Sequence, residues 1–302
     1  MPIRGWRALR ADAALLAVAA IWGFTFVMVK LAVAALPPFN FLALRFWLAF
    51  AVLLTIFPRR TLAALPRALG PGFLIGAFLF GGYTFQTYGL MLTSASKAGF
   101  ITGLAVVLVP CISALLFRRW PAWPVMAGVV AATAGLALLT LEGTLLPGSG
   151  DLLVLVGACF YALHIVTVGR FAPRFDPLAL ATLQLGGVAL LSTLAALATE
   201  GWRPVPPGVW PAIILTGVFA SALAMAVQNW AQRDTTAAHT AIIFASEPVF
   251  AALGGYLLAG EVLAARGWVG GALVILGTAV AELPAGVPSA RVALRQLRPD
   301  GG

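Results

Sequence analysis

The chain has 302 residues, of which 61% are hydrophobic and only 10% are charged, and its mean hydropathy is +0.99. Soluble globular domains carry about 25% charged residues, so this composition excludes a soluble domain and predicts an integral membrane protein. The net charge of +9 is spread singly or in pairs between apolar runs, which favours membrane topology over nucleic-acid binding.

Ten apolar runs are long enough to cross a bilayer, because a hydrocarbon core of about 30 Å needs roughly 20 helical residues. In chain order, the predicted spans cover residues 12–35, 38–57, 70–92, 98–117, 123–141, 150–169, 177–199, 209–231, 239–259 and 266–283. The longest connections, Pro58–Leu69 and Glu200–Gly208, are too short for an independent domain. The predicted fold class is therefore an all-α integral membrane protein with ten transmembrane helices.

The basic residues predict the orientation of these spans. The chain starts like a secretory signal, with a basic segment before an apolar one, but the apolar run continues to Ala35, which is span length. Fourteen Lys and Arg residues fall on one side of the membrane and four on the other, with Arg45 inside a span. The positive-inside rule then places both termini in the cytoplasm of a cell with a bacterial-type inner membrane, and an even number of spans agrees with ten.

The two halves of the chain repeat each other weakly. Residues at matching places recur in order: Trp22 with Phe160, Pro38 with Pro177, Arg45 with Gln184, Pro110 with Pro248, and Gly128 and Gly135 with Gly270 and Gly277. Each half holds five spans, an odd number, so the second half enters the membrane from the opposite side. We predict a first five-helix repeat at 12–141, a second, inverted repeat at 150–283, and a short cytoplasmic tail at 284–302.

Three short motifs carry a resemblance to a known family. They are Trp22-Gly23-x-x-Phe26, Leu44-Arg45-Phe46, and Ser246-Glu247-Pro248-Val249 followed by Gly260-Glu261. Across residues 12–283 the chain resembles the EamA-type transporters of the drug/metabolite transporter (DMT) superfamily. The resemblance implies ten helices in two inverted repeats, and amino acid exporters of the YddG type are the expected closer relation. The first-half counterpart reads Leu108-Val109-Pro110-Cys111, so it offers no second carboxylate.

Glu247 and Arg45 are the charged residues expected at bilayer depth, where a charge costs about 2.5 kcal/mol or more unless it is compensated. Glu247 could bind a substrate ammonium group, carry a coupling proton, or serve as a fixed partner for a basic side chain or free backbone N–H groups. Arg45 could hold a substrate carboxylate, pair with Glu247, or reach the interface. Pro110 and Pro248 each remove a helix hydrogen bond, so we expect kinks there, as gating joints or as static bends.

The remaining candidates are polar or aromatic residues well inside spans. The interfacial aromatic belt does not explain Trp22 and Trp47, which leaves cavity lining or core packing. Gln228 and Asn229 fall near a cytoplasmic helix end, where solvation is an adequate explanation. The other polar groups either line a cavity or bridge helices. The predicted substrate cavity is lined by Trp22, Arg45, Trp47, Gln86, Tyr161, His164 and Gln184.

Several functions are excluded by residues that the chain lacks. Neither Lys30 nor Lys97 follows a glycine, so the sequence has no phosphate-binding P-loop and we expect that this chain by itself is not an ATP-driven pump. His164 and His239 lie on different predicted helices without a nearby cysteine or acid, so we expect no enzyme, no metal and no cofactor. The predicted function is a secondary transporter that exports small metabolites, most of all amino acids or related amphipathic compounds, by alternating access.

Three points stay open at this stage. Transport could be coupled to protons or follow the substrate's own gradient, and the carrier could be a monomer or a homodimer. The alternatives to a metabolite carrier are a translocator of lipid or polyprenyl-linked substrates and a membrane module that does not transport.

Overall fold

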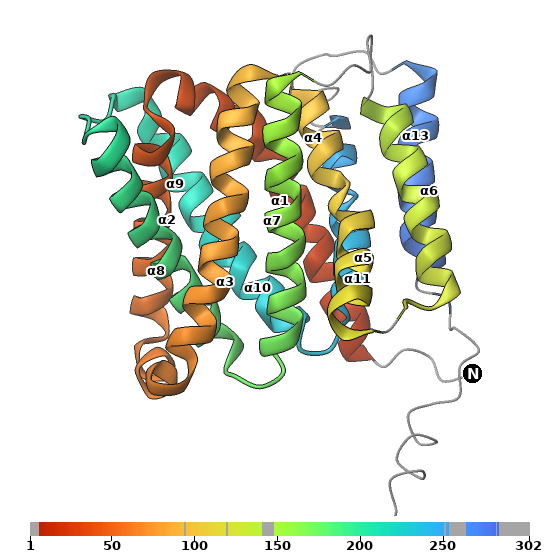
Figure 1. Cartoon of the computed structure of the whole chain (residues 1–302), viewed down its shortest axis with the longest axis horizontal. Helices are drawn as coiled ribbons and strands as arrows, with labels where there is room; N and C mark the ends of the chain where they lie inside the picture. Colours follow the sequence, from red (N-terminus) through yellow and green to blue (C-terminus); the bar gives the residue numbers. More distant parts are fainter. Residues whose placement is uncertain are drawn as a thin grey trace, which may run out of the picture.

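The computed structural model describes residues 6–93, 95–118, 120–140, 148–250, 252–253, 264–281 and 283. These residues form helices that lie side by side in one bundle (Figure 1), and no strand occurs in the described ranges. The helices long and apolar enough to span a membrane are Pro38–Ile56, Pro58–Leu92, Ala98–Phe117, Ser149–Phe171, Pro177–Glu200 and Pro207–Ala231. The all-helical membrane fold class is therefore confirmed.

The helix bounds follow the order of the predicted spans. In the first half they are α1 Trp6–Ala35, α2 Pro38–Ile56, α3 Pro58–Leu92, α4 Ala95–Gly103, α5 Ala105–Phe117 and α6 Trp123–Thr140. In the second half they are α7 Ser149–Phe171, α8 Pro177–Ala195, α9 Trp210–Gly217, α10 Ala224–Ala231, α11 Ala237–Phe244 and α13 Ala265–Ala281. Short irregular turns extend these helices: the π-helical η1 Ala196–Glu200 and η3 Val218–Leu223, and the 3-10 turn η2 Pro207–Val209.

Two predicted span boundaries are wrong. The connection expected at Pro58–Leu69 is the start of α3, because proline at the first helical position has a suitable φ and no N–H that needs a partner. The ninth span is interrupted: α11 ends at Phe244, Ala245 and Ser246 form a turn, and a new helical stretch begins at Glu247. Residues 254–259 of that predicted span lie outside the described residues.

Helices α6 and α13 lie at one side of the bundle and pack directly backbone to backbone (Figure 1). A Cβ atom on Gly128 would lie 2.5 Å from the carbonyl oxygen of Gly277, and one on Gly135 would lie 2.5 Å from that of Gly270. The two helices are therefore antiparallel. The sequence matches Gly128 with Gly270 and Gly135 with Gly277, and across this seam the partners are exchanged, as expected where two equivalent helices pack antiparallel.

Helix α3 joins the two halves of the chain. A Cβ on Gly76 would lie 2.5 Å from the carbonyl oxygen of Gln184 in α8, and a Cβ on Gly82 would lie 2.6 Å from the ring of Tyr161 in α7. Such contacts are possible only because glycine has no side chain. They hold the middle of α3 against the second half, which positions its polar residues beside α7.

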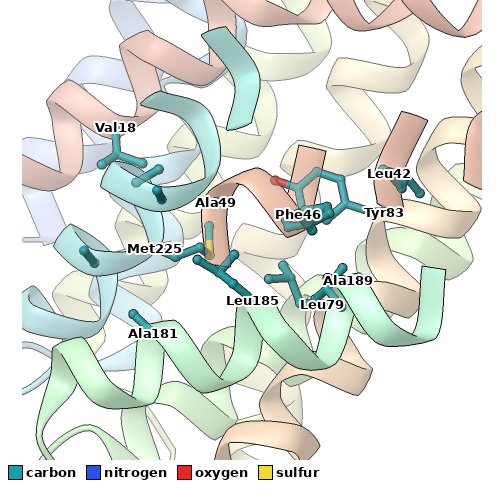
Figure 2. Close-up of a cluster of buried hydrophobic side chains, with 14 of the residues drawn as sticks. Val18, Leu42, Phe46, Ala49, Leu79, Tyr83, Ala181, Leu185, Ala189 and Met225 are labelled. Atoms are coloured by element: carbon teal, nitrogen blue, oxygen red, sulfur yellow. The ribbon is translucent and has the colours of Figure 1, made fainter. Parts of the chain in front are cut away.

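A large apolar core lies among α1, α2, α3, α8 and α10. Figure 2 shows part of it, with Val18, Phe46, Leu79, Leu185 and Met225 converging from these five helices. Large apolar side chains also remain exposed on the outer faces of the bundle; Leu115, for example, is 80% exposed. In a bilayer these faces contact lipid tails, which are as apolar as leucine.

A hydrogen-bonded cluster ties three helices together at one end of the bundle. The carboxylate of Glu200 accepts hydrogen bonds from the backbone N–H groups of Phe39 and Asn40, at 3.1 and 3.2 Å, in the first turn of α2. The hydroxyl of Tyr88 in α3 donates to the same carboxylate at 2.8 Å. A carboxylate at a helix N-terminus satisfies otherwise unpaired N–H groups. The contacts among Glu200, Phe39, Asn40 and Tyr88, called the outer cluster below, therefore fix η1, at the end of α8, to α2 and α3.

The α6–α13 seam predicts a specific sensitivity to one methyl group. We expect Gly135→Ala to lower the free energy of unfolding by about 1–3 kcal/mol, because the new Cβ would force apart two backbones that touch. The matched control is Gly70→Ala, since nothing lies within 4 Å of a Cβ at that position. Thermal unfolding of the purified protein in detergent measures both. Equal melting temperatures for the two variants would contradict the close packing.

The outer cluster predicts a graded loss of stability. Glu200→Ala should lower the free energy of unfolding by about 1–2 kcal/mol, because the first turn of α2 loses its acceptor. Tyr88→Phe removes one hydrogen bond and should cost less, while Glu200→Gln keeps an acceptor oxygen and should fall between. Thermal melting checks this order. A Glu200→Ala protein that melts at the wild-type temperature would rule out the cluster as a stabilising contact.

Candidate functional site

A cavity lies where α1, α2, α3, α4, α7, α10 and α11 approach one another. Its volume, taken as the space that the centre of a water molecule can occupy, is about 100 Å³. One water molecule needs roughly 10–15 Å³ on the same measure. The cavity therefore has room for a small metabolite. Its polar and aromatic lining residues include Trp22, Arg45, Tyr83, Gln86, Thr102, Tyr161, His164, Gln228 and Glu247.

Arg45 is held in this lining by neutral groups. Its side chain is buried, and Nε donates to Ser221 Oγ at 2.7 Å. Nη2 donates at longer distance to the Tyr83 hydroxyl, at 3.3 Å, and to the Ala220 carbonyl oxygen, at 3.4 Å. The guanidinium carbon also lies 4.7 Å from the centre of the Tyr83 ring, a cation–π distance.

The acceptors for Arg45 come from an irregular turn of the eighth span. Ala220 and Ser221 belong to the π-helical turn η3 between α9 and α10. The Ala220 carbonyl oxygen also accepts a hydrogen bond from Nε1 of Trp22 in α1, at 2.8 Å. Single π turns inside α-helices are frequent at functional sites. Here the turn supplies polar contacts to Trp22 and Arg45 at bilayer depth.

A second polar chain crosses the cavity wall. The hydroxyl of Tyr161 in α7 donates to Gln86 Oε1 in α3 at 2.8 Å, and Gln86 Nε2 donates to Thr102 Oγ1 in α4 at 3.0 Å. The rings of Tyr83 and Tyr161 meet edge to face, with centroids 5.4 Å apart. This chain links both halves of the protein around the cavity.

Glu247 reaches the same cavity from the interruption after α11. Pro248 has no N–H to donate to the carbonyl oxygen of Phe244, four residues earlier. This missing hydrogen bond accounts for the end of α11 at Phe244. Glu247 lines the cavity. Among the residues that the structure describes, no ion pair joins it to Arg45, so the pairing left open by the sequence is not found.

Two sequence-predicted residues lie away from the cavity. Trp47 is 40% exposed on the outside of α2 and donates to Thr193 Oγ1 at 2.8 Å. Gln184 is fully buried, with Oε1 2.8 Å from His164 Nε2, so it lies behind a lining residue. The other five expected residues, Trp22, Arg45, Gln86, Tyr161 and His164, all line the cavity.

Pro110, where the sequence predicts a kink, does not interrupt its helix. It is buried inside a continuous α5, and the irregular turn in this span lies six residues earlier, at Leu104. The amide of Leu104 donates to both Phe100 and Ile101 carbonyl oxygens, so the helix tightens there and then continues. Ala98–Phe117 remains one span.

Sequence reasoning missed several residues of the site. The sequence does not single out Tyr83, Thr102 or Ser221, because a single polar residue in an apolar run does not reveal which helix it faces. Gln228 is buried, lines the cavity and donates to Gln232 at 2.9 Å, so solvation at a helix end is the wrong explanation. Asn229 is likewise buried.

His239 also has an acid that its sequence neighbours did not reveal. His239 Nε2 lies 2.9 Å from Asp12 Oδ1, 227 residues away in the chain. The contact joins the start of α1 to the start of α11. In the described ranges, no group of three His, Cys, Asp or Glu side chains is arranged to hold a metal ion.

A protein-family comparison matches both halves of the chain. The family described as "EamA-like transporter family" matches residues 9–141 and again residues 148–282. Each match covers one of the five-span halves, and together they cover nearly the whole described bundle.

Curated relatives agree with this family. The chain is 34% identical over 283 residues to an "Uncharacterized transporter" of Archaeoglobus fulgidus, covering 92% of this chain and 88% of the relative. It is 26% identical to "Uncharacterized transporter YcxC" of Bacillus subtilis, covering 85% and 88% of the two chains. It is also 26% identical to "Uncharacterized inner membrane transporter YedA" of Escherichia coli K12, covering 89% and 90%.

A solved crystal structure has the same fold. It superposes with a TM-score of 0.76 over 97% of this chain and 99% of the other, at 22% sequence identity. With both halves matched by the family and a relative above 30% identity, the chain belongs to the EamA-like transporter family of the drug/metabolite transporter superfamily and is a multi-pass membrane transporter, not an enzyme.

Proposed function

We propose that this protein is a secondary transporter that exports small metabolites, amino acids or related amphipathic compounds above all, by alternating access around the central cavity. The observation that carries the proposal is the cavity itself, which gathers a buried arginine, Arg45, an acidic side chain, Glu247, and a row of hydrogen-bonding side chains at bilayer depth. Ionisable groups in such a place mark a polar substrate path by default.

Interrupted helices around the cavity support alternating access. The spans that reach it are irregular at Leu104 between α4 and α5, at Ala245 and Ser246 after α11, and at η3 beside Arg45. Irregular backbone at bilayer depth is tolerated where it is buried in protein or lines a cavity. Secondary transporters built from inverted repeats use such interrupted helices at their binding sites.

Contacts at the two ends of the bundle provide candidate gates. Glu200 joins the end of α8 to α2 and α3, and the Asp12–His239 contact joins α1 to α11 at the opposite end. With both termini in the cytoplasm, the outer cluster faces the periplasm and the Asp12–His239 contact faces the cytoplasm. In the proposed cycle, the two contacts open in turn, so that the cavity faces one side of an inner membrane at a time.

The driving force in this proposal is either proton exchange at Glu247 or the substrate's own gradient. Glu247 is the acid that lines the cavity, so it is the residue that would carry a coupling proton. The working unit is a monomer or a homodimer, with the cavity contained in one chain.

Transport in proteoliposomes tests the function. We expect saturable, substrate-dependent counterflow of at least one labelled amino acid or small amphipathic metabolite, and we expect any stimulation by an imposed pH gradient to disappear in Glu247→Gln, which cannot ionise. The matched control is Asp176→Asn, which neutralises a carboxylate that pairs with Arg60 at 3.4 Å, outside the cavity lining.

The same assay separates the alternatives. Counterflow that ignores the gradient and survives Glu247→Gln makes the protein a facilitator and returns Glu247 to a structural role. Failure of the whole metabolite panel contradicts the carrier proposal. Movement of lipid or polyprenyl-linked substrates in its place would favour a lipid translocator.

The interruption before Glu247 predicts a turnover defect. Pro248→Ala restores an N–H that can donate to Phe244, so it should join α11 to the following helical stretch. We expect the maximal counterflow rate to fall by about tenfold, equivalent to about 1.4 kcal/mol in barrier, with little change in substrate affinity. Pro110→Ala, in the uninterrupted α5, is the control. Unchanged turnover in Pro248→Ala would dismiss this joint.

A further inference from the structure

The cavity is lined by a basic and an acidic side chain that form no ion pair with each other. Arg45 and Glu247 both line it, and no ion pair joins them among the described residues. An ionised group left unpaired away from water costs several kcal/mol. A ligand that brings an anion to Arg45 and a cation to Glu247 would therefore favour the ionised form of both side chains.

Arg45 has an unused end of its guanidinium. Nε and Nη2 donate to Ser221, Tyr83 and Ala220, and all three acceptors are uncharged. Nη1 donates to no acceptor in the described part of the chain, although it carries two hydrogens. Because Arg45 lines the cavity, these donors are available to a carboxylate, which an arginine fork binds well.

Glu247 provides the opposite pole. Its carboxylate accepts no hydrogen bond from any described side chain or backbone group, and it lines the cavity beside the turn at Ala245. Tyr83 and Tyr161 line the same cavity as Glu247 and Arg45, and the Tyr83 hydroxyl accepts a hydrogen bond from Arg45. The acidic and the basic side chain therefore border one shared region, next to the tyrosine pair.

The rest of the wall is suited to an apolar side chain. Leu79, Met225 and Phe244 line the cavity together with the Trp22 ring, whose centroid lies 4.8 Å from that of Phe244. Burying a leucine-sized side chain against such a surface contributes roughly 1.5–3 kcal/mol. A ligand with two charged ends and an apolar branch would satisfy all three parts of the lining.

We propose that the cavity selects an amphipathic zwitterion by its two charges, with the carboxylate at Arg45 Nη1, the ammonium at Glu247 and the apolar branch against Leu79, Met225 and Phe244. The inference rests on the proposed transport function and adds the residues that discriminate substrates. A compound with only an ammonium group leaves Arg45 without a partner, and a compound with only a carboxylate leaves Glu247 without one. Compounds of both kinds therefore bind weakly.

A matched set of three ligands tests the poles on the wild-type protein. L-Leucine carries both charges, 3-methylbutylamine lacks the carboxylate, and 4-methylpentanoate lacks the ammonium, while the apolar branch is the same in all three. Calorimetric titration of the purified full-length protein in nanodiscs gives each affinity. We expect leucine to bind about tenfold or more tightly than either analogue, as the loss of a charge-assisted contact predicts.

Substitutions assign each pole to its residue. Arg45→Gln should weaken leucine about tenfold or more and leave 3-methylbutylamine unchanged, whereas Glu247→Gln should weaken leucine and leave 4-methylpentanoate unchanged. Arg60→Gln and Asp176→Asn make the same charge changes outside the cavity lining and should alter no affinity. If Arg45→Gln does not fold, Arg45→Lys keeps the charge but loses the fork, and the wild-type ligand set is decisive without any variant.

The outcomes separate this inference from the proposed function. Equal wild-type affinity for leucine and a single-charge analogue overturns the two-pole site, as does a variant that weakens all three ligands equally. Counterflow of some metabolite without any binding of the leucine set sustains the carrier and overturns the poles. The predicted binding pattern without counterflow sustains the poles and overturns the transport function.

Discussion

Charge at bilayer depth is the constraint on which the rest of this structure depends. Arg45 is only 3% exposed, and the groups that hold it are a hydroxyl, a phenol, a carbonyl oxygen and aromatic faces. A regular helix uses its own carbonyl groups internally. The π turn at Ala220 and Ser221 departs from that pattern beside Arg45, and the interruption before Glu247 departs from it beside that carboxyl group.

Close glycine packing makes the surroundings of these charges rigid. Gly76 and Gly82 bring α3 into contact with α8 and α7, while Gly128 and Gly135 join α6 to α13. Both seams join the first half of the chain to the second. The cavity therefore lies between two halves that pack tightly at some helix pairs and meet through irregular helices at others. Such an arrangement is expected of a scaffold with moving parts.

Both halves of the chain match one family, but the site is not symmetric. Arg45 comes from the first half, and its repeat counterpart Gln184 is uncharged and contacts His164 behind the lining. Glu247 comes from the second half, where the matching place before Pro110 in the first half is Val109. A basic side chain from one half and an acidic one from the other thus face one cavity, which gives the binding region two different ends.

The sequence by itself determined the membrane class, the order of the spans and the residues able to carry chemistry, because hydropathy and the cost of buried charge act locally. The positions of Trp22 and Trp47 along their helices did not reveal the direction that each side chain faces. Trp22 lines the cavity, and Trp47 faces outward. Only the tertiary structure placed Ser221 beside Arg45 and Asp12 beside His239, since these contacts join residues far apart in the chain. Packing between helices, with glycine seams that let backbones touch, decides such neighbours, and no local pattern encodes it.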